Sequence, residues 1–129
     1  MTFGPTAPSL QRMGGLIRNF GILLLLSTGG VAMAERAETG NMEALRTLFE
    51  RGQEAYEHGR YDEALAAFME AWEVRETPSL LYNAAVCREK LGDRTGAASL
   101  FRWYLDEAPQ TRDRKAIEAR IAALRKPAR

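Results

Sequence analysis

Apolar residues recur every three or four positions along most of this chain, which is the spacing of one buried face of an α-helix. Five such stripes follow one another after residue 40, and no alternating strand pattern competes with them. The fold class is therefore predicted to be all-α. The predicted helices cover residues 42–58, 62–74, 77–91, 93–108 and 111–125.

The ends of the predicted helices carry residues suited to helix termini. Asn41 is a candidate N-cap for the first helix, and Gly59 can close it in the left-handed conformation. Thr77 and Pro78 open the third helix as cap and first-turn proline, and Gly92 closes it. The connections predicted in this way are turns of a few residues, which favour antiparallel neighbouring helices.

Two ten-residue segments share residues at a separation of 33. They are GRYDEALAAF at residues 59–68 and GDRTGAASLF at residues 92–101. Both have a glycine first, an alanine five residues later and a phenylalanine nine residues later. Internal similarity at a fixed period of a few tens of residues is typical of repeat proteins.

The blocks around these segments resemble two tetratricopeptide repeats. The matching positions are Gly52, Gly59, Ala64, Phe68 and Ala71 in the first block, and Ala85, Gly92, Ala97, Phe101 and Pro109 in the second. The second block departs from the family pattern at Tyr104, where a small residue is usual. The first departs at Glu76, where proline is usual. The resemblance implies two antiparallel helix-turn-helix repeats at 42–76 and 77–109, with residues 110–129 as a basic capping helix and tail. Such an assembly is a short right-handed α-solenoid.

The resemblance also implies a binding groove, because the first helices of successive repeats in this family line a concave surface that receives a peptide or helix of another protein. The groove residues expected here are Phe49, Gln53, Tyr56, Tyr82, Asn83, Val86, Lys90 and Arg120, with Glu57 and Glu89 beside them. Peptide-binding members clamp a carboxylate with a groove asparagine and basic residues. Only Asn83 and Arg120 fit that role in this chain.

The N-terminal segment predicts export. Residues 1–34 read as a signal peptide, with Arg12 and Arg18 before an apolar run and a small-x-small cleavage site at residues 32–34. Met13 is a better start for such a segment than Met1. Residues 35–41 would then be a short linker. The expected location is periplasmic or secreted, in agreement with a weaker likeness to short exported repeat proteins of Gram-negative bacteria. The alternative is an uncleaved segment that anchors the chain to the inner membrane.

Charge is divided unevenly along the part of the chain after the predicted signal peptide. Residues 35–76 contain 11 acidic and 5 basic residues, and residues 77–129 contain 6 acidic and 11 basic ones. Such a division can orient a partner or allow head-to-tail self-association, so a homo-oligomer is one prediction. The other interpretation is that both regions are ordinary solvated helix faces.

The predicted C-terminal helix is basic. Its bases include Arg112, Arg114, Lys115, Arg125 and Lys126. A nucleic-acid partner is not expected, because neither interleaved aromatic residues nor a basic domain is present. Anionic lipid or an acidic partner would suit these bases. A capping helix with a polar outer face would explain them equally.

Catalytic and cofactor chemistry are not expected. The chain has one histidine, His58, and one cysteine, Cys87, so the usual soft ligands cannot form a metal cluster. His58 suits a helix C-terminus, and Cys87 lies among small apolar residues as a buried thiol would. Trp103 either packs on the last helix or is partly exposed for a partner.

The sequence therefore predicts a non-catalytic protein-binding scaffold or adaptor of the bacterial cell envelope. The alternative function is a membrane-anchored assembly factor that uses the uncleaved N-terminal segment and the basic C-terminal helix.

Overall fold

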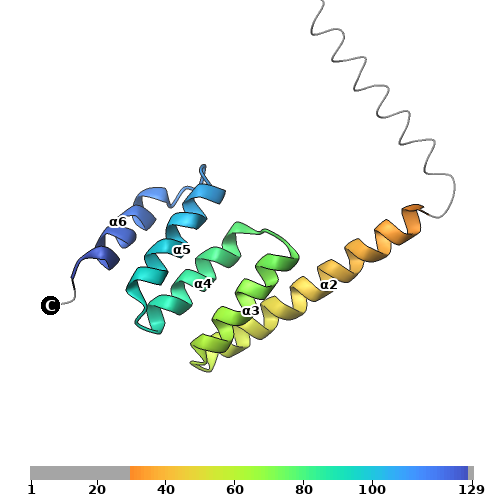
Figure 1. Cartoon of the computed structure of the whole chain (residues 1–129), viewed down its shortest axis with the longest axis horizontal. Coiled ribbons are helices and arrows are strands. Elements are labelled where there is room, and N and C mark those ends of the chain that lie inside the picture. Colours follow the sequence, from red (N-terminus) through yellow and green to blue (C-terminus); the bar gives the residue numbers. More distant parts are fainter. Residues whose placement is uncertain (1–29, 128–129) are drawn as a thin grey trace, which may run out of the picture. The chain divides into compact units, whose positions relative to one another are not determined.

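The computed structural model describes residues 30–127, and these residues form five α-helices and no strand. The helices are α2 (Gly30–Glu57), α3 (Tyr61–Val74), α4 (Pro78–Lys90), α5 (Arg94–Glu107) and α6 (Arg114–Arg125). The predicted all-α class is confirmed. In Figure 1, α3, α4, α5 and α6 lie side by side in chain order, each antiparallel to the helix before it.

Helix α2 begins well before the predicted first helix. Asn41 is an interior residue of α2, so the prediction that it is an N-cap is wrong, and residues 35–41, predicted as a linker, are helical. This segment is exposed and has no apolar stripe, but its alanine, glutamate and arginine residues have high intrinsic helix propensity. Extending a formed helix is much easier than starting one, so the pattern of buried positions does not mark where α2 begins.

The unit that contains the core runs from Asn41 onward. The predicted signal peptide lies outside the described residues, except for its last part, residues 30–34, which belongs to α2. In the described part of the chain, no helix combines the length and apolar character needed to cross a bilayer.

The turns after α2 and after α4 have the same backbone hydrogen bonds at the spacing of the sequence repeat. Gly59 and Gly92 both adopt the left-handed conformation, with φ of 72° and 82°. Gly59 N–H donates to the Tyr56 carbonyl at 3.0 Å, and Gly92 N–H donates to the Glu89 carbonyl at 3.0 Å. These are the glycine-closed helix ends that the sequence predicted.

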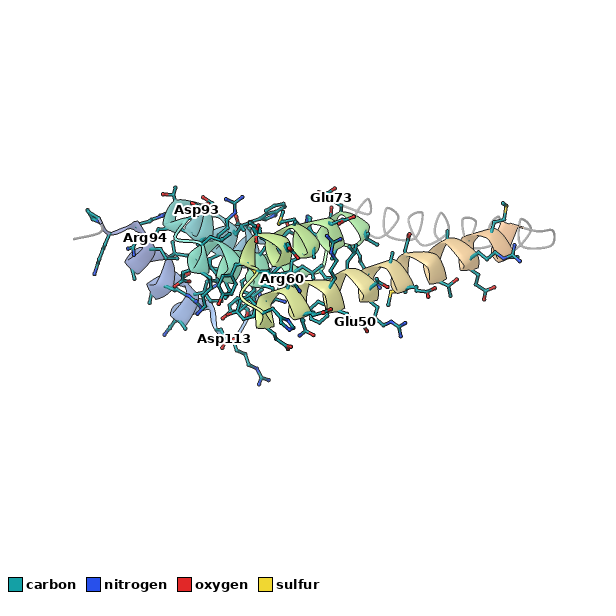
Figure 2. All side chains as sticks on the ribbon, turned by 90° about the horizontal axis from the view of Figure 1, so that it is seen from below. Glu50, Arg60, Glu73, Asp93, Arg94 and Asp113 are labelled. Atoms are coloured by element: carbon teal, nitrogen blue, oxygen red, sulfur yellow. The ribbon has the colours of Figure 1, made fainter. Side chains whose placement is uncertain are left out.

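The N-terminus of α5 is fixed by a carboxylate that also binds an arginine. Asp93 accepts a hydrogen bond from Gly96 N–H at 2.8 Å and pairs with Arg88 of α4 at 2.5 Å. A Cβ on Gly96 would overlap both of these side chains. Figure 2 labels Asp93 beside Arg94 at this helix start. Asp93 is therefore the N-cap of α5.

The Asp93 cap predicts a dependence of stability on pH. The Gly96 N–H first, and then Arg88, lower the pKa of the Asp93 carboxyl below its usual 3.8. A lowered pKa in the folded state means that the ionised carboxylate stabilises the fold above its usual pKa, and that this contribution is lost as the pH falls through the lowered pKa. We expect the stability difference between the native chain and Asp93→Asn to be constant from pH 7 to about pH 5 and to shrink at lower pH. Urea denaturation at several pH values measures it.

The control for this experiment is Asp113→Asn. Asp113 occupies the N-cap position of α6 but makes no side-chain capping bond. Its replacement should therefore give no comparable difference at neutral pH. A difference for Asp93→Asn that stays the same from pH 7 to pH 2 would contradict the proposed role of the Asp93 charge.

The hydrophobic core joins α3, α4, α5 and α6, with one buried residue from α2, Ala55. Its larger members are Phe68, Trp72, Leu80, Leu81, Leu100, Phe101, Leu105, Ile117, Ile121 and Leu124. Small residues lie where helices approach closely: Ala64, Ala85 and Ala97 are fully buried. A Cβ on Gly52 of α2 would lie 2.7 Å from the Phe68 ring of α3. The small and aromatic residues of the repeat pattern therefore pack together as such patterns require.

Cys87 is one of the fully buried core residues. Burial raises the pKa of its thiol to about 11, so the thiol is protonated at neutral pH and a poor nucleophile. The expectation of a buried thiol that acts as a small hydrophobic side chain is confirmed.

Helix α6 begins three residues later than predicted, at Arg114. Thr111 lies in the preceding turn, where its hydroxyl is 3.0 Å from the hydroxyl of Tyr104. Arg114 donates to the Leu105 carbonyl at 2.9 Å, and Arg94 of α5 donates to the carbonyls of Ala123 and Lys126 at 2.8 and 3.1 Å. Arginines from both helices thus tie α6 to α5.

Candidate functional site

Two hollows lie one after the other along α2 and α4. The first, here called the apolar hollow, has a volume of about 600 Å³. It is lined by Met42, Glu43, Leu45, Arg46, Phe49, Thr77, Ser79 and Leu80. The second, here called the polar hollow, has a volume of about 400 Å³. It is lined by Gln53, Tyr56, Glu57, Phe68, Tyr82, Asn83, Val86 and Arg120. We call the two together the groove.

Most of the residues expected in a groove line the polar hollow. They are Gln53, Tyr56, Tyr82, Asn83, Val86 and Arg120. Phe49 lines the apolar hollow instead. Lys90, also expected, is exposed at the end of α4 and lines neither hollow. The structure therefore brings together six of the eight expected side chains.

Sequence reasoning missed the apolar hollow. Phe49 was expected in the groove, but Met42 and Leu45 were not. Leu45 and Phe49 are half-buried and pack against the core, and Met42 is 50% exposed. The spacing of these three residues, at steps of three and four, is the same for a core stripe and for the wall of a surface hollow. The exposure of Met42 shows that this stripe is the wall of a hollow and not a core stripe, but that exposure is known only from the fold.

Arg120 of α6 reaches the polar hollow and is held by three groups. Its guanidinium pairs with the Glu89 carboxylate at 2.8 Å, lies 3.4 Å from the Tyr82 hydroxyl, and sits 4.8 Å above the Phe101 ring centroid. A carboxylate clamp built from Asn83 and Arg120 is therefore already occupied by Glu89, because an incoming carboxylate would have to displace it.

Tyr82 belongs to both the hollow and the packing beneath it. Its ring meets those of Phe101 and Tyr104 edge-on, with centroids 5.5 and 5.7 Å apart. Replacing Tyr82 would therefore disturb the fold as well as the hollow. Gln53 and Asn83 line the hollow without belonging to the core, so they are better positions for testing binding.

The charges along the groove are only partly compensated. Arg46 pairs with Glu50 at 3.8 Å within α2, and Arg120 pairs with Glu89. In the part of the chain that the structure describes, Glu43 of the apolar hollow and Glu57 of the polar hollow take part in no ion pair. The two acids lie at opposite ends of the groove along α2.

Trp103 of α5 packs on Trp72 of α3, with ring centroids 5.1 Å apart in an edge-on arrangement. Its indole N–H donates to Glu107 at 3.2 Å, and the side chain stays 38% exposed. The aromatic partner of Trp103 therefore comes from α3. Packing on the last helix had been one of the two expectations for Trp103. The exposed fraction leaves the other expectation, contact with a partner, as a prediction.

His58, another residue considered for chemistry, makes a hydrogen bond to the backbone. His58 Nδ1 donates to the Glu54 carbonyl at 2.8 Å, at the end of α2. Among the described residues, no three histidine, cysteine, aspartate or glutamate side chains are arranged to hold a metal ion.

No protein-family model matches this chain, and no similar protein was found among curated sequences or solved structures.

Proposed function

We propose that this chain is a non-catalytic helical-repeat scaffold that binds a peptide or helix of a partner protein in the groove between α2 and α4. The observation that supports it best is that both hollows are lined by these two helices, the first helices of the two proposed repeats. The recurrence of the turn hydrogen bonds at the period of the sequence repeat supports the tetratricopeptide-like arrangement on which the proposal depends.

The dimensions and composition of the groove suit a protein partner. The lined part of α2, from Met42 to Glu57, is about 22 Å long at 1.5 Å per residue. Its half-buried Leu45 and Phe49 offer apolar contact area beside the amides of Gln53 and Asn83. An apolar patch next to a few polar groups is typical of surfaces that bind other proteins.

We further propose that the scaffold acts in the bacterial cell envelope after export. This part of the proposal depends on the signal-like segment at residues 1–34. Mass spectrometry of the N-terminus of the native protein tests it. A chain that begins near Glu35 supports export with cleavage, whereas a membrane-bound chain that keeps the signal-like segment would favour the anchored alternative.

The binding proposal is tested by crosslinking in cells followed by identification of captured proteins. The double variant Gln53→Ala with Asn83→Ala removes two side chains that line the polar hollow and leaves the core intact. We expect it to reduce capture of the main partner by several-fold. The control is Glu73→Ala on α3, an exposed residue that lines neither hollow. Equal capture by both variants would contradict groove binding.

A further inference from the structure

The distribution of charge along the groove points to a particular class of partner. Between Met42 and Glu57, α2 carries the acids Glu43, Glu50, Glu54 and Glu57 and the bases Arg46 and Arg51. Both bases already have acidic partners, Glu50 for Arg46 and Glu70 for Arg51. A ligand in the groove therefore meets acids that have no ion pair among the described residues. To bind either arginine of this stretch, the ligand would have to compete with the acid already paired with it.

The opposite wall of the groove adds little charge. The residues of α4 and its N-cap that line the two hollows are all uncharged: Thr77, Ser79, Leu80, Tyr82, Asn83 and Val86. Arg120, the cation contributed by α6, is neutralised by Glu89. The lining residues Glu43, Glu57, Arg46 and Arg120, counted with the paired Glu50 and Glu89, are four acids and two bases. This negative balance disfavours acidic ligands.

The two acids that line the hollows have a defined spacing. Glu43 and Glu57 lie about four helical turns apart on α2, which corresponds to about 21 Å along the helix axis. Between them lie the half-buried Leu45 and Phe49. The groove thus presents an acid near each end and an apolar stretch between them.

We propose that the groove binds an amphipathic helix of a partner protein whose apolar face carries a lysine or arginine at each end, one facing Glu43 and the other facing Glu57. This inference rests on the proposed function, since it assumes that the groove is the binding surface. A helix is the fitting shape because the ridge of side chains on one helix packs into the groove between two others. Large apolar side chains of the ligand would fill the apolar hollow, whose 600 Å³ volume suits them.

The test uses three synthetic helical peptides with the same apolar face, each about five helical turns long so that it spans both acids. One has lysines about four turns apart at the ends of that face, one has glutamates there, and one keeps the lysines but has its apolar positions scrambled. Binding to the full chain is measured by fluorescence anisotropy. We expect the lysine peptide to bind about 2- to 30-fold more tightly than the glutamate peptide, the range for two exposed ion pairs. Added salt should reduce this difference.

Variants of the two acids separate the role of their charge from that of the fold. Glu43→Gln with Glu57→Gln should remove most of the preference for lysine, and Glu43→Lys with Glu57→Lys should reverse it. The matched control is Glu54→Gln, which removes an acid of the same helix that lines neither hollow and should leave the preference nearly unchanged. Circular dichroism of each variant verifies that its helices are intact.

Other outcomes would overturn the inference in distinguishable ways. Equal or tighter binding of the glutamate peptide, with capture still lost in the Gln53 and Asn83 variant, would reject the basic partner and leave the proposed function standing. If none of the three peptides bound, the basic partner would also be rejected. If the Gln53 and Asn83 changes left capture unaffected, groove binding itself would be rejected. If a lysine peptide that contains proline bound as tightly as the helical lysine peptide, the inference that the ligand is a helix would be rejected. A concentration-dependent dimer that the lysine variant abolishes would identify a second copy of this chain as the occupant.

Discussion

Replacing Phe101 by alanine is expected to lower the free energy of unfolding by about 3–5 kcal/mol, the usual range for a buried phenylalanine. Phe101 is fully buried, and its ring contacts Tyr82 edge-on with centroids 5.5 Å apart. Its removal would leave a cavity at the centre of the α4, α5 and α6 packing. The loss also deprives Arg120 of the ring beneath its guanidinium, at 4.8 Å. Because small domains have a net stability of about 5–15 kcal/mol, this single change should bring the fold close to its limit.

Urea denaturation of the full chain measures this effect. The milder variant Phe101→Leu keeps most of the volume and should give a folded protein even if the alanine variant does not fold. Trp103→Ala is the control, because Trp103 lies on the same helix but is 38% exposed; it should cost less than Phe101→Ala. If the two alanine variants had the same midpoint, Phe101 would not be the packing centre that the structure indicates.

Replacing Gly52 by alanine should destabilise the protein by about 1–3 kcal/mol, the usual cost of overpacking a well-filled core. Alanine normally stabilises a helix interior relative to glycine by roughly 1 kcal/mol, so the expected sign is the reverse of the helix propensity. The reason is steric: the added Cβ would lie 2.7 Å from the Phe68 ring, which is itself only 3% exposed and cannot move aside freely.

Gly40 supplies the matched control on the same helix. A Cβ there would have no atom within 4 Å, so Gly40→Ala should leave stability unchanged or raise it through helix propensity. Thermal unfolding monitored by circular dichroism compares the two variants directly. Stabilisation by both alanines would show that α2 and α3 do not approach as closely as the structure places them.

Local patterns in the sequence were enough to predict α3, α4 and α5 to within one or two residues. α3 and α5 have clear apolar stripes, α4 has buried residues at helical spacing, and the ends of the three are defined by Gly59, Pro78 or Asp93. The prediction failed at the beginnings of α2 and α6, where the helix boundary depends on propensity and on turn geometry. At α6 the chain stays in turns through Thr111, whose hydroxyl lies beside that of Tyr104. A contact of this kind, between a turn and a helix, has no local sequence pattern.

Most residues of the polar hollow could be predicted from the sequence, but the ion pair beside them could not. Helical spacing together with the repeat resemblance placed Gln53, Tyr56, Asn83 and Val86 on one surface, and the structure has them around one hollow. The partnership of Arg120 with Glu89, which lies on a different helix, could not be inferred from either helix alone. That partnership decides whether Arg120 is free to bind a carboxylate, so the charge preference of the groove became apparent only from the fold.

The two glycine turns have a consequence for how this chain can change by substitution or recombination. Their backbones are alike, but the side chains that secure them differ: Arg60 pairs with Glu63 in the first, at 3.4 Å, whereas in the second Asp93 binds both Gly96 N–H and Arg88. Glu63 and Gly96 are 33 residues apart and occupy equivalent positions in the two similar segments, yet a Cβ at Gly96 would displace the Asp93 carboxylate and the Arg88 guanidinium from their pair. Single exchanges between the two similar segments are therefore expected to disturb these turns, whereas transfer of a whole turn with its pairing residues is expected to preserve them. In genetic terms, substitutions at these positions are expected to be epistatic.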